Sequence, residues 1–95
     1  NRVMHEQFLP LASSCYEALL ESQPRAQGNV ELRFSVMGDQ AVGGVVVDVA
    51  LGDGTTLSDN AFATCIHESM YSVVFDPPPP GHPTLTVTQS FELSP

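Results

Sequence analysis

The sequence contains no lysine, and its basic side chains are the arginines Arg2, Arg25 and Arg33, against eleven acidic residues. A nucleic-acid-binding protein needs clustered cationic side chains to displace counterions from the phosphates. The composition therefore excludes a nucleic-acid partner, and it disfavours anionic membrane surfaces for the same reason. The net charge of −8 either serves solubility alone or favours a basic or neutral protein partner.

Long apolar runs are also missing, because no stretch approaches the roughly 18 residues that a transmembrane helix requires. We therefore expect no direct membrane insertion by this domain. Residues 1–95 suffice for a single small domain. The sequence begins at Asn1 and shows no signal peptide. We expect a piece excised from a longer protein, whose targeting signals and anchor lie outside these residues.

Residues that could support catalysis or bind metal are few and scattered. The histidines are His5, His67 and His82. His67 lies two positions from Cys65, so on a helix the two side chains point to different faces. The serines lack a Gly-x-Ser-x-Gly nucleophile elbow, and Asp53 and Asp59 lack the spacing of a calcium loop. We therefore expect no enzyme activity, no metal site and no cofactor.

Two segments are predicted to be amphipathic helices. The apolar face of the first comprises Met4, Phe8, Leu11, Cys15 and Leu19, which recur every three or four positions. Pro10 predicts a kink, or a helix that begins near it, because proline lacks a backbone N–H. The second helix begins after Ser58 or Asp59 as N-cap and runs to about Met70. Its apolar face comprises Phe62, Cys65, Ile66 and Met70.

The two cysteines lie on the predicted inner faces of these helices. They form either a disulfide or two buried free thiols, and the shared inward orientation of Cys15 and Cys65 favours the disulfide. Closing a loop of about 50 residues would stabilise the fold by roughly 4 kcal/mol in the chain-entropy model. A persistent disulfide would indicate an oxidising compartment, such as the periplasm or the cell exterior.

Alternating residues predict three strands, at Val30–Val36, Val42–Ala50 and Thr84–Leu93. In the first strand, Val30, Leu32, Phe34 and Val36 share the apolar face. In the second strand, Val45, Val47 and Val49 are expected to alternate against Val46 and Asp48, and Gly43-Gly44 marks a bulge or a weak start. In the third strand, Leu85, Val87, Phe91 and Leu93 face one way, and Thr84, Thr86, Thr88, Ser90 and Glu92 face the other. The prolines at Pro77–Pro80, with Gly81 and Pro83, predict a rigid connector or, alternatively, a ligand for a proline-binding module.

The element order α-β-β-α-β indicates an α+β fold. Because each strand has one apolar face, both helices are expected to cover the same face of a three-stranded antiparallel sheet. The short connection makes the first two strands a hairpin, and the crossover through the second helix places the last strand parallel to the second. The strand order is then 2-1-3, and the last strand lies at an edge.

Several segments resemble a known family. Gly28-x-Val30-x-Leu32-x-Phe34, with a turn near Gly38-Asp39, resembles the first hairpin of TonB C-terminal domains. Leu57-Ser58-Asp59 through Cys65, followed by Val74-Phe75-x-Pro77, resembles their second helix and its exit. Leu9-Pro10 with Cys15-Tyr16-Glu17 and Cys65 is similar to the AgmX/PglI C-terminal domain branch. The second helix departs from the family in ending His67-Glu68-Ser69-Met70-Tyr71, without basic residues.

This resemblance implies a TonB-like domain of a bacterial envelope protein, located in the periplasm and non-enzymatic. It implies a protein or peptide segment of another envelope protein as partner, paired with the last strand. The partner-binding residues are then Thr84, Thr86, Val87, Thr88 and Ser90. The alternative is a structural assembly domain that forms a homodimer through its sheet edge. Tyr16 and Tyr71 are either further partner contacts or partly buried rim residues.

Overall fold

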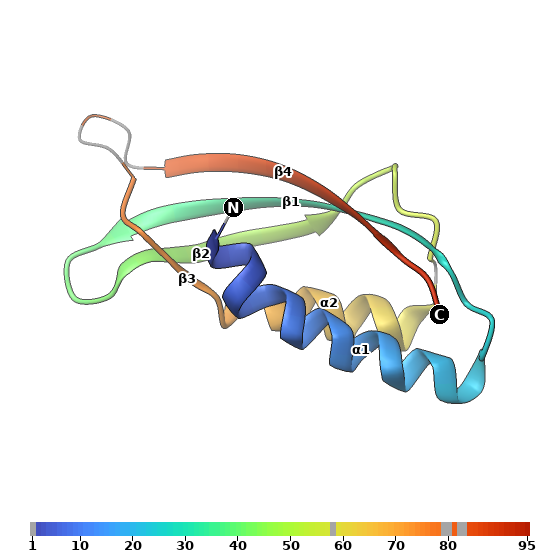
Figure 1. Ribbon diagram of the computed structural model, residues 1–95. Helices are drawn as coiled ribbons and strands as arrows, with labels where there is room; N and C mark the ends of the chain where they lie inside the picture. The colour runs from blue at the N-terminus through green and yellow to red at the C-terminus, as the bar shows by residue number, and fades with distance from the viewer. Residues whose placement is uncertain (1, 58, 79–80, 82–83) are drawn as a thin grey trace.

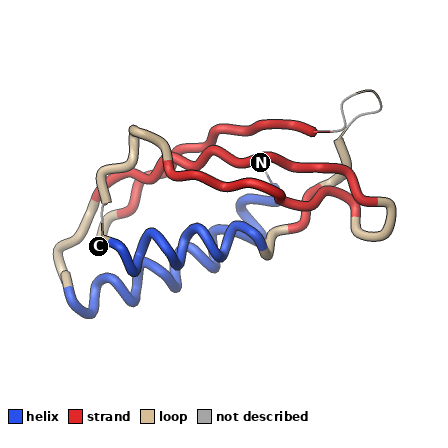
Figure 2. The backbone as a smooth tube through the Cα atoms, turned by 180° about the vertical axis from the view of Figure 1, so that it is seen from behind, coloured by secondary structure: helices blue, strands red, loops and turns tan. Residues whose placement is uncertain are grey.

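The computed structural model describes residues 2–57, 59–78, 81 and 84–95, and it has an α+β fold. Its elements are the π-helix η1 (Met4–Phe8), α1 (Leu9–Ser22), β1 (Gly28–Asp39), β2 (Gly43–Leu51), α2 (Asn60–Tyr71), β3 (Val74–Phe75) and β4 (Thr84–Leu93). The helices form one layer and the curled sheet forms the other (Figure 1). The view from behind shows the same two layers, with both helices on one face of the sheet as expected (Figure 2).

The sheet has the order β3-β2-β1-β4, and every neighbouring pair is antiparallel. The predicted order of the three long strands is confirmed, and β4 has the predicted bounds. The expected number of strands was wrong, because β3 adds a fourth strand beside β2. Its two residues pair Phe75 with Gly44 and Val74 with Val45. A two-residue strand is too short to show the alternation from which strands are predicted.

The core lies between the two layers, and its residues follow the alternation of β1. Val30, Leu32, Phe34 and Val36 are all buried, whereas Arg33 and Met37 face away from the helices and are exposed. Phe34 stacks on Phe75 at 5.4 Å between ring centroids. Across the layer, the helices contribute Met4, Phe8, Ala12, Cys15, Tyr16, Leu19, Phe62, Ile66 and Met70.

The alternation predicted for β2 is broken by a β-bulge. Ser35 pairs with Asp48, but the next residue of β1, Val36, pairs with Val46, so Val47 is the extra residue. Consequently Val46 and Val49 are buried, whereas Val47 is 45% exposed. The expected face of Val45, Val47 and Val49 was therefore wrong, because a bulge reverses the phase of a strand. A run of valines carries no polar residue that would reveal this reversal.

The apolar face of the first helix also differs at one position. Leu11 is 37% exposed, and Ala12 is buried in its place. Pro10 stands in the first turn of α1, directly after the π-helix η1. A π turn has more residues than an α turn, and its wider geometry accommodates a residue that cannot donate an N–H. The face that begins with Met4 and Phe8 therefore continues through Ala12.

The second helix has the predicted apolar face, and its N-cap is Asp59. A carboxylate oxygen of Asp59 accepts a hydrogen bond from the Phe62 N–H at 2.9 Å, as an N-cap residue does. The alternative cap, Ser58, lies outside the described residues, as do Pro79, Pro80, His82 and Pro83 of the predicted connector. No helix in the described part of the chain is both long and apolar enough to cross a bilayer.

The predicted crosslink is present. Cys15 of α1 and Cys65 of α2 form a disulfide, with their Cα atoms 5.7 Å apart. Tyr16, next to it, is buried and donates a hydrogen bond from its hydroxyl to the carbonyl oxygen of Ala26, which fixes the turn after α1. Tyr16 is therefore a core residue, whereas Tyr71 is 41% exposed beside His67.

Candidate interaction site at the β4 edge

The five residues predicted to bind a partner all lie on β4, at one edge of the sheet. β4 pairs with β1 on one side, and no described strand lies beyond it. Thr84, Thr86, Thr88 and Ser90 are exposed, whereas Val87 faces the helices and is half-buried. The structure therefore brings these residues together on one strand but divides them between two faces.

Hydrogen bonds of β1 determine which backbone groups of β4 point outward. On the side of β1 away from β4, the carbonyl oxygens of Glu31 and Asn29 accept hydrogen bonds from the N–H groups of Gly52 and Thr56. On the same side, the N–H groups of Glu31 and Asn29 donate to the hydroxyls of Thr55 and Thr56. Backbone groups alternate along a strand, so the even-numbered residues of β1 point toward β4.

The register then assigns the backbone groups of β4. Leu32 is opposite Gln89 and Phe34 is opposite Val87, so these odd-numbered residues of β4 bond to β1. The N–H and C=O groups of the intervening residues point away from the sheet. The outward-pointing residues are Thr84, Thr86, Thr88, Ser90 and Glu92. The threonine and serine residues predicted from the sequence are therefore the ones that offer free backbone hydrogen-bonding groups.

β4 lacks the features that usually prevent an edge strand from pairing with another chain. Its pairing with β1 runs without a bulge from Met37↔Thr84 to Gly28↔Leu93. Within these bounds it contains no lysine and no proline, the residues that commonly block pairing with another chain. On the outer face, the hydroxyls of Ser35 and Thr86 lie 3.3 Å apart and form a hydrogen bond that orders the strand. β4 is therefore a long, regular edge able to accept another strand.

The helix-side face of β4 is only partly covered. Leu85 is 40% exposed, and Val87 and Phe91 are half-buried, whereas Val30 and Leu32 of the neighbouring β1 are fully buried. Phe91 contacts Phe8 of η1 edge-to-face, with 5.6 Å between ring centroids. The helix-side apolar side chains of a strand added beside β4 would pack against this surface, and such burial is favourable by about 25 cal/mol per Å².

A pocket lies on this face near the start of β4. It has a volume of about 260 Å³ and is lined by Val3, Val36, Phe75, Asp76, Pro77, Leu85 and Val87. Both views show that the hairpin end of the sheet extends beyond the helices, so the helices leave this end uncovered (Figures 1 and 2). The segment that follows β3 forms one wall of the pocket, and β4 forms the other.

The glycines of β2 allow this segment to cross the sheet. A Cβ atom at Gly44 would lie 2.5 Å from the carbonyl oxygen of Asp76 and 2.8 Å from a methyl carbon of Val36, which no side chain tolerates. Gly43 has a φ angle of 114°, in the region that favours glycine. The Gly43-Gly44 pair therefore marks a close backbone approach, and the predicted bulge lies instead at Val47.

Sequence reasoning did not identify Phe75, Asp76 and Pro77 as part of a site. They follow the second helix, far from β4 in sequence, and were interpreted as the exit of that helix, with Pro77 as the start of the predicted connector. The pair Gly43-Gly44 was the available signal, because adjacent glycines in a strand indicate that another backbone lies close by.

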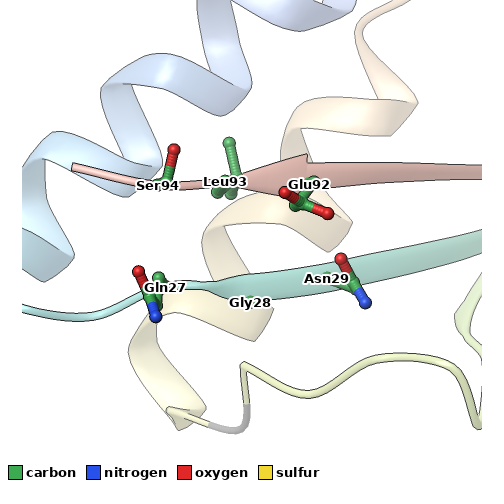
Figure 3. Close-up of a pocket in the computed structure, with 6 residues that line it drawn as sticks. All are labelled: Gln27, Gly28, Asn29, Glu92, Leu93 and Ser94. Carbon is green, nitrogen blue, oxygen red and sulfur yellow. The ribbon is translucent and has the colours of Figure 1, made fainter.

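A second space lies at the opposite end of the β1–β4 pair. It has a volume of about 300 Å³ and is formed by Gln27–Asn29 before and within β1 and by Glu92–Ser94 at the end of β4 (Figure 3). The side chains around it are mostly polar and exposed, apart from Leu93. Among the residues that line this space, Glu92 is the one with a titratable side chain.

The described residues show neither a candidate metal-ligand cluster nor an extensive network of ion pairs. They contain no group of three or more His, Cys, Asp or Glu side chains that could hold a metal ion. Within residues 2–57, 59–78, 81 and 84–95, the one ion pair joins Arg2 to Glu6 at 3.8 Å on the exposed surface. Comparison with protein-family models, curated proteins and solved structures gave no match.

Proposed function

We propose that this domain is a non-enzymatic protein-interaction module that binds an extended segment of a partner protein by strand addition to β4. The observation that carries the proposal is the outward orientation of the backbone groups of Thr86, Thr88 and Ser90 on an edge without protection. Main-chain hydrogen bonds to these groups supply affinity, and pockets for alternate side chains supply specificity. Each such bond contributes about 0.5–1.5 kcal/mol net.

The proposed compartment is the periplasm or another extracytoplasmic space, with a cell-envelope protein as partner. The disulfide between Cys15 and Cys65 supports an oxidising environment, because persistent disulfides are rare where thiols are kept reduced. The resemblance of the hairpin and the Cys15-Tyr16-Glu17 segment to TonB C-terminal domains supports the same location.

Amide hydrogen exchange tests the mechanism directly. In the free domain, the amides of Thr86, Thr88 and Ser90 should exchange rapidly, whereas those of Val87 and Gln89, bonded to β1, should be protected. A partner captured from an envelope extract should protect the first group. Protection confined to the helices on adding that partner would show that strand addition is the wrong mechanism.

A substitution at Thr88 gives an independent test. Thr88→Pro removes an outward-pointing backbone donor without removing a bond to β1, so partner binding should fall at least about tenfold with little loss of stability. Thr88→Val is the matched control, because it keeps the N–H group and the β-branched shape, and its binding should be unchanged. Equal binding by the two variants would refute a role for this donor.

Self-association through β4 is the alternative outcome. Antiparallel pairing of two copies centred on Thr88 would place Thr86 opposite Ser90, which favours a regular ladder of hydroxyl side chains. Each copy, however, carries a net charge of −8, and like charges oppose association. Sedimentation equilibrium across a concentration series would detect a dimer. Thr88→Pro should abolish that dimer if β4 forms it.

A further inference from the structure

The pocket beside Leu85 is the feature of the β4 edge that can select a partner. Its volume of about 260 Å³ lies below the roughly 300–1,000 Å³ of pockets that enclose drug-sized ligands. Its walls are mainly apolar, formed by Phe75 and Pro77 on one side and by Leu85 and Val87 on the other. This size and lining fit one apolar side chain of a larger chain better than a free small molecule.

An added strand would bring such a side chain to the pocket. The outward backbone groups of Thr84, Thr86 and Thr88 would bond to the partner, and the side chains of those partner residues would share the outer face with them. The partner residues opposite Leu85 and Val87 would then project to the helix side of the sheet. The pocket lies on that same side of the sheet, across Leu85 and Val87 from the added strand, so a long apolar side chain at one of these positions would reach it.

The charge of the domain indicates which peptides would bind. Asp76 is one of the residues that line the pocket, and it is exposed. No described arginine is ion-paired with Asp76, and the whole chain has three basic residues against eleven acidic ones. A cationic side chain next to the apolar anchor would gain from Asp76 directly, and a cationic segment would gain from the field of the domain.

We propose that the pocket between Phe75 and Leu85 binds an apolar side chain of an extended cationic peptide segment, with a lysine or arginine of that segment beside Asp76. This inference rests on the proposed strand addition to β4. It adds the class of partner: a basic chain that alternates apolar and polar residues, in contrast to a second copy of this acidic domain.

A palindromic probe peptide tests the proposal in either strand direction. Its sequence reads the same in both directions. It has a lysine at each end and a valine in the middle, and threonine alternates with leucine between them. Titrated into the 15N-labelled domain, it should shift the amides of Thr84–Glu92 and of Phe75 and Asp76. Replacing its leucines with alanine should weaken binding about tenfold, and replacing its lysines with glutamate should weaken it by more than that. Equal affinity of the lysine and glutamate peptides would overturn the cationic assignment.

Variants of the domain locate the anchor. Leu85→Lys should weaken binding of the probe about tenfold, whereas Val42→Lys, which adds the same charge at the exposed turn between β1 and β2, should not. Asp76→Asn should weaken binding about threefold and reduce its salt dependence, and Asp48→Asn, on the exposed outer side of β2, is the matched control. If the two variants of a pair weakened binding of the probe equally, the proposed role of the pocket would be overturned.

The outcomes separate this proposal from strand addition itself. In one outcome, the probe shifts β4 amides and Thr88→Pro abolishes its binding, but the pocket variants bind the probe normally. Strand addition is then supported, and the proposal that the pocket holds an apolar side chain is wrong. If the probe binds Thr88→Pro normally and shifts only residues around Phe75 and Leu85, strand addition is wrong. If millimolar probe shifts no amide of β4, the cationic peptide is not the partner and this proposal is overturned.

Discussion

Removing the disulfide should destabilise the domain by about 4 kcal/mol. The crosslink joins Cys15 to Cys65 across 50 residues of sequence, and the loss of loop-closure entropy for a loop of this length amounts to about 4 kcal/mol at 25 °C. Domains of this size have a free energy of unfolding of about 5–14 kcal/mol. The crosslink therefore contributes a large share of the total stability.

Denaturant titration of three samples measures this contribution. The oxidised protein is compared with the reduced protein and with the variant carrying both Cys15→Ser and Cys65→Ser. The serine at position 15 would lie near the hydroxyl of Ser69, which is 3.6 Å from the sulfur in the native protein, so its hydroxyl would have a polar neighbour. The midpoint should fall in both comparison samples. The m value should rise, because an unfolded chain without the crosslink exposes more surface.

The reduced protein is the more stringent comparison, since it differs from the native protein only in the S–S bond. A loss below about 1 kcal/mol on reduction would refute the loop-closure explanation. Alkylation of two thiols in protein purified without reductant would refute the crosslink itself.

Two further predictions concern local contacts. Phe34→Ala should destabilise the disulfide-bonded domain by about 3–5 kcal/mol in a denaturant melt, because it leaves a cavity against the ring of Phe75; a loss below about 1 kcal/mol would contradict the assigned core face. Asp59→Ala should cost about 1 kcal/mol through loss of the N-cap hydrogen bond to α2, whereas Asp53→Ala, exposed in the preceding loop, should change stability by less than about 0.5 kcal/mol. Equal losses in the two aspartate variants would exclude the cap as the cause.

The predictable parts of the fold are those that show a clear periodicity or a local signal in the sequence. The bounds of β4 follow from its threonines, because Thr84, Thr86 and Thr88 mark one face without ambiguity. The Asp59 cap and the Cys15–Cys65 pair were likewise accessible from spacing. These features depend on local chemistry or on one periodicity, which a single sequence displays.

The remaining features depend on local backbone irregularities or on contacts between distant segments. The bulge at Val47 lies in a run of valines, and the π turn before Pro10 changes which residue faces the core. The two-residue strand β3 exists because its segment crosses Gly44 and is held by the stacking of Phe75 on the core. The wall that Phe75 forms in the pocket results from that crossing. The sequence therefore predicted β4 as an edge strand, but it did not predict the pocket beside it.

The position of the disulfide divides the chain into a closed part and an open part. Residues 15–65 form a covalent ring that contains β1 and β2, whereas β4 lies on the C-terminal arm beyond Cys65. The disulfide therefore places no covalent constraint on β4, which is held to β1 by noncovalent contacts from Met37↔Thr84 to Gly28↔Leu93. The strand proposed to receive a partner is thus free of the covalent constraint, and an exchange of β4 arms between two molecules would leave each crosslinked ring intact.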